Sequence, residues 1–223
     1  LKEIDKNKLY SFLREMEFNR LLSSAISTYG EIEFSNKTKD FDKEEKNYKI
    51  SNQNYELIEK EEDIDKWLNE AEESGEIAVD TETSSLDPHQ AKLVGISFST
   101  KIGKACYIPI GHTEGKNFEE KKVIKKIKSV LEDKSIKKIG QNIKFDYIIF
   151  YHRGINMNTM EDTMLMSYVL DAGKNRHNMD VLSEIHLDHK TIAFKDLVGT
   201  GKKQINFSEV KIDKAKDYAA EDA

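Results

Sequence analysis

The stretch from residue 76 to residue 110 reads EIAVDTETSSLDPHQAKLVGISFSTKIGKACYIPI. Within it, three apolar runs have the length and the β-branched content of strands, and turn-forming residues separate them. The three runs are Glu76 to Asp80, Leu93 to Thr100 and Lys104 to Ile110, with Asp87-Pro88 and Gly103 between them. This pattern predicts three consecutive strands in an antiparallel meander.

Helical patterns surround the meander on both sides. A short strand near Tyr55 and a helix over about Glu62 to Glu73 precede it, and Ser74-Gly75 ends that helix. A helix from about Phe118 to Leu131 and a strand over Ile136 to Ile139 follow it. Later helices are expected over about Ile143 to His152, Glu161 to Leu170, Met179 to Ile185 and Asp213 to the end. This order predicts an α/β fold in which a mixed sheet is flanked by helices.

The N-terminal part of the chain has a different pattern. Apolar side chains at three- and four-residue spacing predict an amphipathic helix, in one piece or two. From Glu31 to Lys49 nearly every residue is charged or polar, which is typical of a flexible linker. We therefore expect a helical segment over 1–30, a linker over 31–54 and a globular domain over 55–223. The apolar positions of the segment are Leu9, Phe12, Leu13, Met16, Leu21, Leu22 and Ile26.

Composition limits the class of protein. The 223 residues are 38% hydrophobic and 34% charged, which fits a soluble globular protein. The sequence has no run of about 18 apolar residues that could span a membrane, and we expect no secretory signal, because its first residues do not resemble one. The single cysteine, Cys106, lies in an apolar run where burial in a strand is expected, and it cannot form an internal disulfide. These features favour a reducing cytoplasm.

The net charge of −6 argues against a protein that holds nucleic acid by neutralising phosphates alone. Any contact with nucleic acid must therefore be local or assisted by a metal ion.

A pair of carboxylates ends the first strand of the meander. Because side chains alternate along a strand, Asp80 and Glu82 point to the same face. Two acids this close repel each other unless a cation lies between them, and oxygen ligands suit Mg²⁺ or Mn²⁺. The alternative is that both acids only make a strand end more soluble.

Two further groups of residues lie at helix ends. In Gly140-Gln141-Asn142-Ile143-Lys144-Phe145-Asp146, a strand ends and a helix begins, with Asn142 as the expected N-cap and Asp146 in the first turns. Near the C-terminus, Tyr218 and Asp222 are four residues apart and share a helix face with two alanines. The phenol could orient a water, although Tyr218 could equally be a core aromatic. The two alanines are Ala215 and Ala219.

Together these groups supply four carboxylates and a tyrosine in the order Asp-x-Glu, Asp, Tyr-x-x-x-Asp. The constellation resembles the tyrosine branch of the DEDD exonuclease superfamily, and in particular the proofreading 3′→5′ exonuclease domain of bacterial DNA polymerase I. The resemblance covers about Tyr55 to the end of the chain. The matching stretches are residues 79–83 with Leu86, 93–98, 107–109, 140–146, 176–180, 189–192 and 218–223.

This resemblance implies a ribonuclease H-like fold and a two-metal-ion mechanism. Asp80, Glu82 and Asp222 would hold one divalent cation, Mg²⁺ or Mn²⁺, and Asp80 would share a second. Asp146 would complete the site partly through water, and Tyr218 would position the attacking water. Hydrolysis at phosphorus would then need no covalent enzyme intermediate and would release a nucleoside 5′-monophosphate.

The resemblance also implies contacts with the 3′ end of single-stranded DNA. Leu86 would act as a wedge between terminal bases, unless it packs routinely against the sheet. The other substrate-binding residues would be Thr83, Gln141, Asn142, Arg176 and Phe194, of which Phe194 could stack on a base. A polymerase domain of the same full-length chain would be the partner, because residues 9–18 look like the end of the flap-nuclease domain that precedes proofreading in that polymerase.

Alternatives remain at this level. A ribonuclease D-like exoribonuclease would share every metal ligand, and a catalytically silent module could serve as a spacer or a single-strand clamp. Asp222 is the penultimate residue, so we expect a truncated last helix, and Leu1 in place of Met is interpreted as a fragment boundary. We expect a monomer. The basic segment Gly199 to Lys203 is expected to be a loop, and His186 and His189 are expected to be ordinary histidines and not zinc ligands.

Overall fold

The structure is a computed structural model that describes residues 4–31 and 53–223. The chain divides into two units, Leu1–Lys46 and Asn47–Ala223. All but the end residues of the linker predicted over 31–54 lie outside the described residues.

The first unit contains two helices, α1 (Lys6–Glu15) and α2 (Asn19–Tyr29), so the predicted amphipathic helix is in two pieces. Asp5 begins α1, because its carboxylate accepts a hydrogen bond from the Lys8 amide at 3.1 Å. Tyr10 is fully buried, and its hydroxyl donates to the carbonyl of Gly30 at 2.7 Å. This bond ties α1 to the end of α2.

The second unit is built on a six-stranded sheet with the order β1-β4-β3-β2-β5-β6. The three central strands pair antiparallel, which confirms the predicted meander, and the outer pairings are parallel. The strand β6, which pairs with β5, was not expected from the sequence. The strands are β1 (Asn54–Leu57), β2 (Glu76–Thr83), β3 (Leu93–Lys101), β4 (Lys104–Pro109), β5 (Lys137–Gly140) and β6 (Met160–Asp162).

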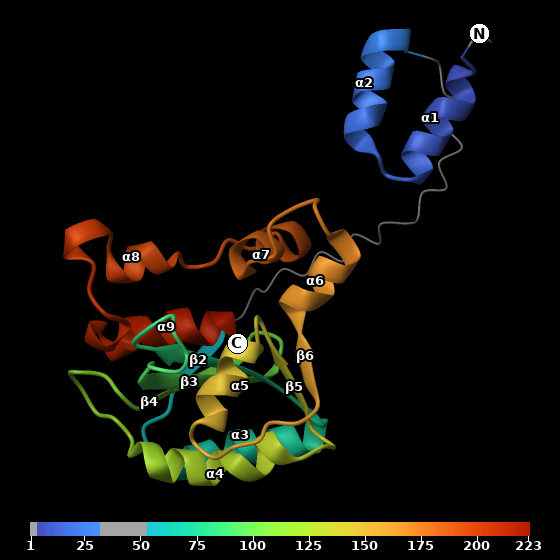
Figure 1. The fold of residues 1–223 in the computed structure, drawn as a ribbon. Helices are drawn as coiled ribbons and strands as arrows, with labels where there is room; N and C mark the ends of the chain where they lie inside the picture. The colour runs from blue at the N-terminus through green and yellow to red at the C-terminus, as the bar shows by residue number, and fades with distance from the viewer. Residues whose placement is uncertain (1–3, 32–52) are drawn as a thin grey trace. The chain divides into compact units, whose positions relative to one another are not determined.

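Helices cover both faces of this sheet (Figure 1). On one face, α3 (Glu61–Ser74), α4 (Glu120–Glu132) and α5 (Lys144–Tyr151) enclose a core that includes Trp67, Phe98 and Phe150. Gly75 ends α3 in the left-handed conformation, as its position after Ser74 predicted. The architecture is therefore the mixed sheet flanked by helices that the sequence predicts.

The opposite face carries α9 (Ile212–Asp222) and a smaller core. After β6, three helices and two 3-10 turns lead to α9. The helices are α6 (Thr163–Asp171), α7 (Met179–Leu187) and α8 (Phe194–Val198), and the first 3-10 turn covers Gly201–Lys203. The basic loop expected at Gly199 to Lys203 thus includes one helical turn. The second 3-10 turn, Phe207–Glu209, leads into α9.

One expectation about local structure was wrong. Asn142 does not cap α5: it has a left-handed φ of 58°, its amide donates to the Asp162 carboxylate at 3.0 Å, and Ile143 takes the N-cap position. The helix expected over about Glu161 to Leu170 is present as α6 and begins at Thr163, because Asp162 caps it by accepting from the Met164 amide at 2.9 Å. Long-range pairing with β5 holds the preceding residues as a strand.

Within residues 4–31 and 53–223, no helix combines the length and the apolar character needed to cross a bilayer.

Candidate active site

The end of β2 places Asp80 and Glu82 on the face of the sheet that α9 covers. Hydrogen bonds to β3 on one side fix their position, since Asp80 pairs with Ser97 and Glu82 with Gly95. Thr81 points to the other face, toward α5. The strand therefore presents two carboxylates together, as the alternation in the sequence predicts.

The third carboxylate comes from α9. Ala215 and Ala219 are both fully buried, so this helix approaches the sheet closely. Asp222, one turn beyond Ala219, then meets the acids of β2: one carboxylate oxygen from each of Asp80, Glu82 and Asp222 lies within 4.8 Å of the other two. In the described part of the chain this is the one group of three acidic, histidine or cysteine side chains so arranged.

The surroundings of these acids disfavour negative charge. Burial raises the pKa of Asp80 to about 6. Burial and then the charge of Asp80 raise the pKa of Asp222 to about 8, and burial together with the other acids holds the pKa of Glu82 well above its usual range. Hard oxygen donors that repel one another in a buried site fit a divalent cation, which would replace the protons.

Asp146 lies beside this group but outside it. The residue sits in the first turn of α5, as predicted, and is 2% exposed. The hydroxyl of Thr81 donates to its carboxylate at 2.5 Å. Burial, followed by the charge of Asp80, holds the pKa of Asp146 well above its usual range. Asp146 thus shares the field of the acids without joining their cluster.

Tyr218 and Asp222 lie on the same face of α9, as their spacing predicts. The Tyr218 hydroxyl hydrogen-bonds to the Asp222 carboxylate, and burial followed by the charge of Asp222 raises the pKa of the phenol above its usual range. The phenol is therefore protonated, and its oxygen lies at the edge of the acid cluster.

Asp80, Glu82, Asp146 and Tyr218 border a cleft of about 650 Å³, whereas Asp222 does not line it. Five of the six predicted substrate-binding residues line it. Leu86 is 96% exposed at its rim, which excludes routine packing against the sheet, whereas Phe194 is partly exposed. Arg176 is exposed in the segment before α7 and does not line the cleft. The predicted residues in the lining are Asp80, Glu82, Thr83, Leu86, Gln141, Asn142, Asp146, Phe194 and Tyr218.

Several lining residues were not anticipated. Phe207 stacks parallel to Phe194 with 6.3 Å between ring centroids, and it lies 6.0 Å from the ring of Tyr218. Asn206 connects the segment before α9 to the loop after β2, because its side-chain amide donates a hydrogen bond to the carbonyl of Ser84 at 2.8 Å. Phe145 could have been inferred from its place next to Asp146, but residues 204–207 carry no local signal. The unanticipated residues are Thr81, Ser84, Ser85, Phe145, Asn178, Gln204, Ile205, Asn206 and Phe207.

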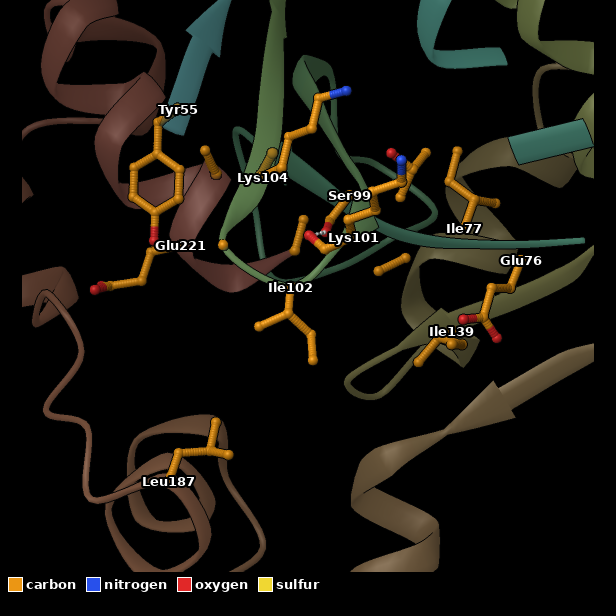
Figure 2. A pocket seen from close by; sticks show the side chains of 16 residues that line it. Tyr55, Glu76, Ile77, Ser99, Lys101, Ile102, Lys104, Ile139, Leu187 and Glu221 are labelled. Carbon is orange, nitrogen blue, oxygen red and sulfur yellow. Dashed lines mark hydrogen bonds between the residues drawn. The ribbon is translucent and has the colours of Figure 1, made fainter. Parts of the chain in front are cut away.

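A second cavity, of about 320 Å³, lies beside the C-terminal end of α9 (Figure 2). The hairpin around Ile102 forms one side, and Tyr55 and Glu221 lie close together at its edge. Burial and the charge of Glu221 raise the pKa of Tyr55 to about 12. None of the three clustered carboxylates lines this cavity, so the cleft at Asp80 is the candidate active site.

His189 connects the segment before α8 to α9. His189 hydrogen-bonds to Glu221 at 2.8 Å, and the other oxygen of Glu221 accepts from the Ile192 amide at 2.6 Å. Neither His186 nor His189 joins a group of metal-ligand type among the described residues. His189 instead holds the segment before α8 against α9, next to Asp222.

Similarity to known proteins points to the same chemistry. A family described as 3′-5′ exonuclease matches residues 55–223. DNA polymerase I of Rhizobium leguminosarum is 41% identical over 181 residues, which cover 72% of this chain and 18% of that protein. DNA polymerase I of Pseudomonas aeruginosa is 35% identical over 236 residues, which cover 99% of this chain and 25% of that protein. The chain thus spans about a fifth to a quarter of the length of these relatives.

Solved structures show the same fold. Escherichia coli RNase D, an exoribonuclease involved in structured RNA processing, superposes with a TM-score of 0.58 at 16% identity, covering 77% of this chain and 42% of that one. At 16% identity this similarity establishes the fold alone, which is ribonuclease H-like. The match over residues 55–223 and the polymerase relatives establish more: the chain belongs to the 3′-5′ exonuclease family and is an exonuclease domain of the kind found in DNA polymerase I.

Proposed function

We propose that this chain removes nucleotides one at a time from the 3′ end of single-stranded or frayed DNA, as the proofreading exonuclease of a DNA polymerase I. The observation that carries the proposal is the meeting of Asp80, Glu82 and Asp222 next to the Tyr218 hydroxyl, at the side of a cleft whose rim exposes Leu86. Acids, phenol and an exposed apolar side chain together suit hydrolysis at a strand end.

In this mechanism the acids would hold two divalent cations, Mg²⁺ or Mn²⁺. Asp80, Glu82 and Asp222 would bind one, Asp80 would share the second, and Asp146 would contribute partly through water. When bound, the ions would lower the pKa of the attacking water and stabilise the leaving 3′-oxygen. Tyr218, protonated and hydrogen-bonded at the cluster, would orient that water for in-line attack.

The rim and walls of the cleft would hold the substrate. Leu86 would wedge between the last bases, and Phe194 would offer a stacking surface. Thr83, Gln141 and Asn142 line the same cleft as Leu86 and the acids of β2, where their polar groups would meet the terminal nucleotide. Arg176 lies outside the lining, so its proposed contact would be with the strand farther from the scissile bond.

We propose that the partner of this domain is the polymerase region of a longer chain, acting in the cytoplasm. The relatives in which this domain occurs are full DNA polymerases. In addition, α6 exposes a row of large apolar side chains, which favours cover by another part of a protein. These side chains are Leu165, Met166, Tyr168, Val169 and Leu170.

Digestion of a 5′-labelled single-stranded DNA, beside an RNA of the same sequence, tests the proposal. With Mg²⁺ or Mn²⁺ we expect a ladder that shortens from the 3′ end of DNA and weak cleavage of RNA. Asp80→Asn should lower the rate by roughly a thousandfold, because the loss of metal-held charge stabilisation costs several kcal/mol. The matched control, Asp63→Asn in the first turn of α3, should cleave like the parent.

The other outcomes point to the alternatives. Faster cleavage of RNA would favour an exoribonuclease like RNase D. Cleavage of neither polymer with either metal would favour a catalytically silent single-strand clamp.

A further inference from the structure

A buried tyrosine lies behind the acid cluster. Glu82 pairs with Gly95, and Gly95 pairs with Pro109, so all three residues face the same side of the sheet. A methyl group at Gly95 would lie 2.0 Å from the hydroxyl oxygen of Tyr107. The ring of Tyr107 therefore crosses β3 in the space that Gly95 leaves open, directly beside the strand that carries Glu82.

The tyrosine hydroxyl is held by His112. Its oxygen lies 2.7 Å from Nε2 of His112, and Nδ1 of the same ring lies 3.0 Å from the carbonyl oxygen of Val210. Because a carbonyl can only accept, Nδ1 carries the proton, and Nε2 accepts from the tyrosine hydroxyl. Both side chains are buried, at 0% and 6% exposure. The imidazole of His112 thus links Tyr107 on β4 to Val210, just before α9, through two hydrogen bonds whose directions are fixed.

The segment to which His112 is hydrogen-bonded, just before α9, also contains Phe207, whose ring lines the cleft. The Thr113 amide donates to the carbonyl of Ser208 at 2.8 Å, which adds a second tie. The His112 ring lies 6.1 Å from Phe207, and Phe207 contacts the ring of Tyr218 at 6.0 Å. Contacts therefore run without a gap from the strand of Glu82 to the phenol beside Asp222.

We propose that His112 is a positioning residue for the exonuclease reaction: together with Tyr107 it holds Phe207 and the start of α9 so that the Tyr218 hydroxyl stays against Asp222. The inference rests on the proposed function. It adds a residue that belongs neither to the acid cluster nor to the lining of the cleft. Ordinary core packing would make His112 matter for stability alone, whereas positioning makes its effect on the rate depend on Tyr218.

Two variants remove the hydrogen bonds and keep the ring volume. His112→Phe removes both bonds of the imidazole, and Tyr107→Phe removes one. The matched control is Tyr147→Phe on α5. This change removes the hydrogen bond of 3.1 Å that the Tyr147 hydroxyl donates to the Asn156 side chain. In single-turnover digestion of 5′-labelled DNA, we expect both site variants to lower the cleavage rate about tenfold or more with the affinity for DNA little changed, and the control to match the parent.

A double-mutant cycle separates positioning from packing. In the Tyr218→Phe background, His112→Phe should lower the rate by less than about twofold, because the hydroxyl that it positions is already absent. An equal loss in both backgrounds would overturn the inference, as would parental rates in both single variants.

Amide hydrogen exchange gives a readout that does not need cleavage. In His112→Phe we expect faster exchange over residues 207–222 than in the parent or in Tyr147→Phe, with α3 and α4 unchanged. Unchanged exchange at 207–222 would overturn the inference even if the parent cleaves DNA. Failure of the parent to cleave would instead overturn the proposed function and leave the exchange result decisive for His112.

Discussion

At the acid cluster, charge and burial oppose each other. Asp80, Glu82 and Asp222 lie within 4.8 Å of one another, and burial raises the pKa of each. At neutral pH without a cation, the site either keeps protons or bears repulsion, and both states cost free energy of folding. A divalent cation bound here would remove this cost, and metal binding and stability would then be coupled properties of the same three side chains.

The first residue-scale prediction concerns pH in the absence of metal. Folding raises the pKa of Asp222 from its usual 3.8 to about 8, so the folded state holds this proton more tightly than the unfolded chain. The free energy of unfolding should therefore fall as pH rises from about 4 toward 8, by an amount on the order of a few kcal/mol. Thermal unfolding in a chelator at several pH values measures this.

Asp222→Asn should flatten that pH dependence, because the amide cannot lose a proton. Adding Mg²⁺ at pH 8 should raise the melting temperature of the parent and leave that of the variant nearly unchanged. A parent whose stability without metal rises between pH 5 and pH 8 would contradict this account.

The second residue-scale prediction concerns Leu86. Because the side chain is 96% exposed, Leu86→Ala should change the free energy of unfolding by no more than about 0.5 kcal/mol. Loss of its proposed contact with terminal bases should raise the KM for single-stranded DNA about tenfold, since a base contact is worth about 1–3 kcal/mol.

Ile102→Ala is the matched control for Leu86. That side chain is 81% exposed on the hairpin between β3 and β4 and does not line the cleft. Its KM should equal that of the parent. Equal KM values for both variants would show that Leu86 does not hold the substrate.

Among the elements, β2 and α9 decide the site, and they are far apart in sequence. The strand supplies two acids by alternation, while the helix supplies Tyr218 and Asp222 by its four-residue repeat. Fully buried Ala215 and Ala219 let the two elements approach until their acids meet. The neighbouring strands β3 and β4 support β2, because the Tyr107 ring of β4 fills the space above Gly95 on β3, beside Glu82.

The element-scale prediction tests the packing of Tyr107 over Gly95. Gly95→Ala should destabilise the protein by about 1–3 kcal/mol, because the added methyl would overlap the Tyr107 ring, whose Cζ would lie 2.2 Å away. Ser99→Ala on the same strand, where no such overlap arises, should lose less. Chemical denaturation of the parent and both variants measures the difference, and equal midpoints for parent and Gly95→Ala would contradict the packing described.

On the scale of the whole molecule, the exonuclease unit contains its own core. Both buried clusters of the sheet draw their members from residues 57–219, and every residue of the candidate site lies in the same unit. The first 46 residues form a separate unit with its own buried Tyr10. This organisation predicts that the catalytic unit folds without the first one.

A chain that begins at Asn47 tests this prediction. Its main thermal transition should lie within about 2 °C of the parent's, which for a domain of this size corresponds to less than about 1 kcal/mol. Its rate on single-stranded DNA should be unchanged, since no residue of the cleft is removed. A fall of about 10 °C or more would show that the first unit contributes to the core of the second.

The sequence predicts the local features of this protein well. Alternation and turn residues predict the meander, periodicity predicts most of the helices, and the spacing of Tyr218 and Asp222 predicts their shared face. The predictions that were wrong depended on distant partners. Asn142 donates to Asp162 instead of capping α5, and β6 exists because β5 pairs with it.

Local chemistry thus indicated, from the sequence alone, that Asp80 and Glu82 share a face suited to a metal ion, and the family resemblance added Asp146 and Asp222. Only the tertiary structure brought Asp222 to Asp80 and Glu82, left Arg176 outside the cleft, and placed Phe207 and His112 behind Tyr218. The reason is physical: the repeats of a helix and a strand are set by backbone geometry within a few residues, whereas contacts between β2, β4 and α9 depend on how buried side chains fill the space between elements.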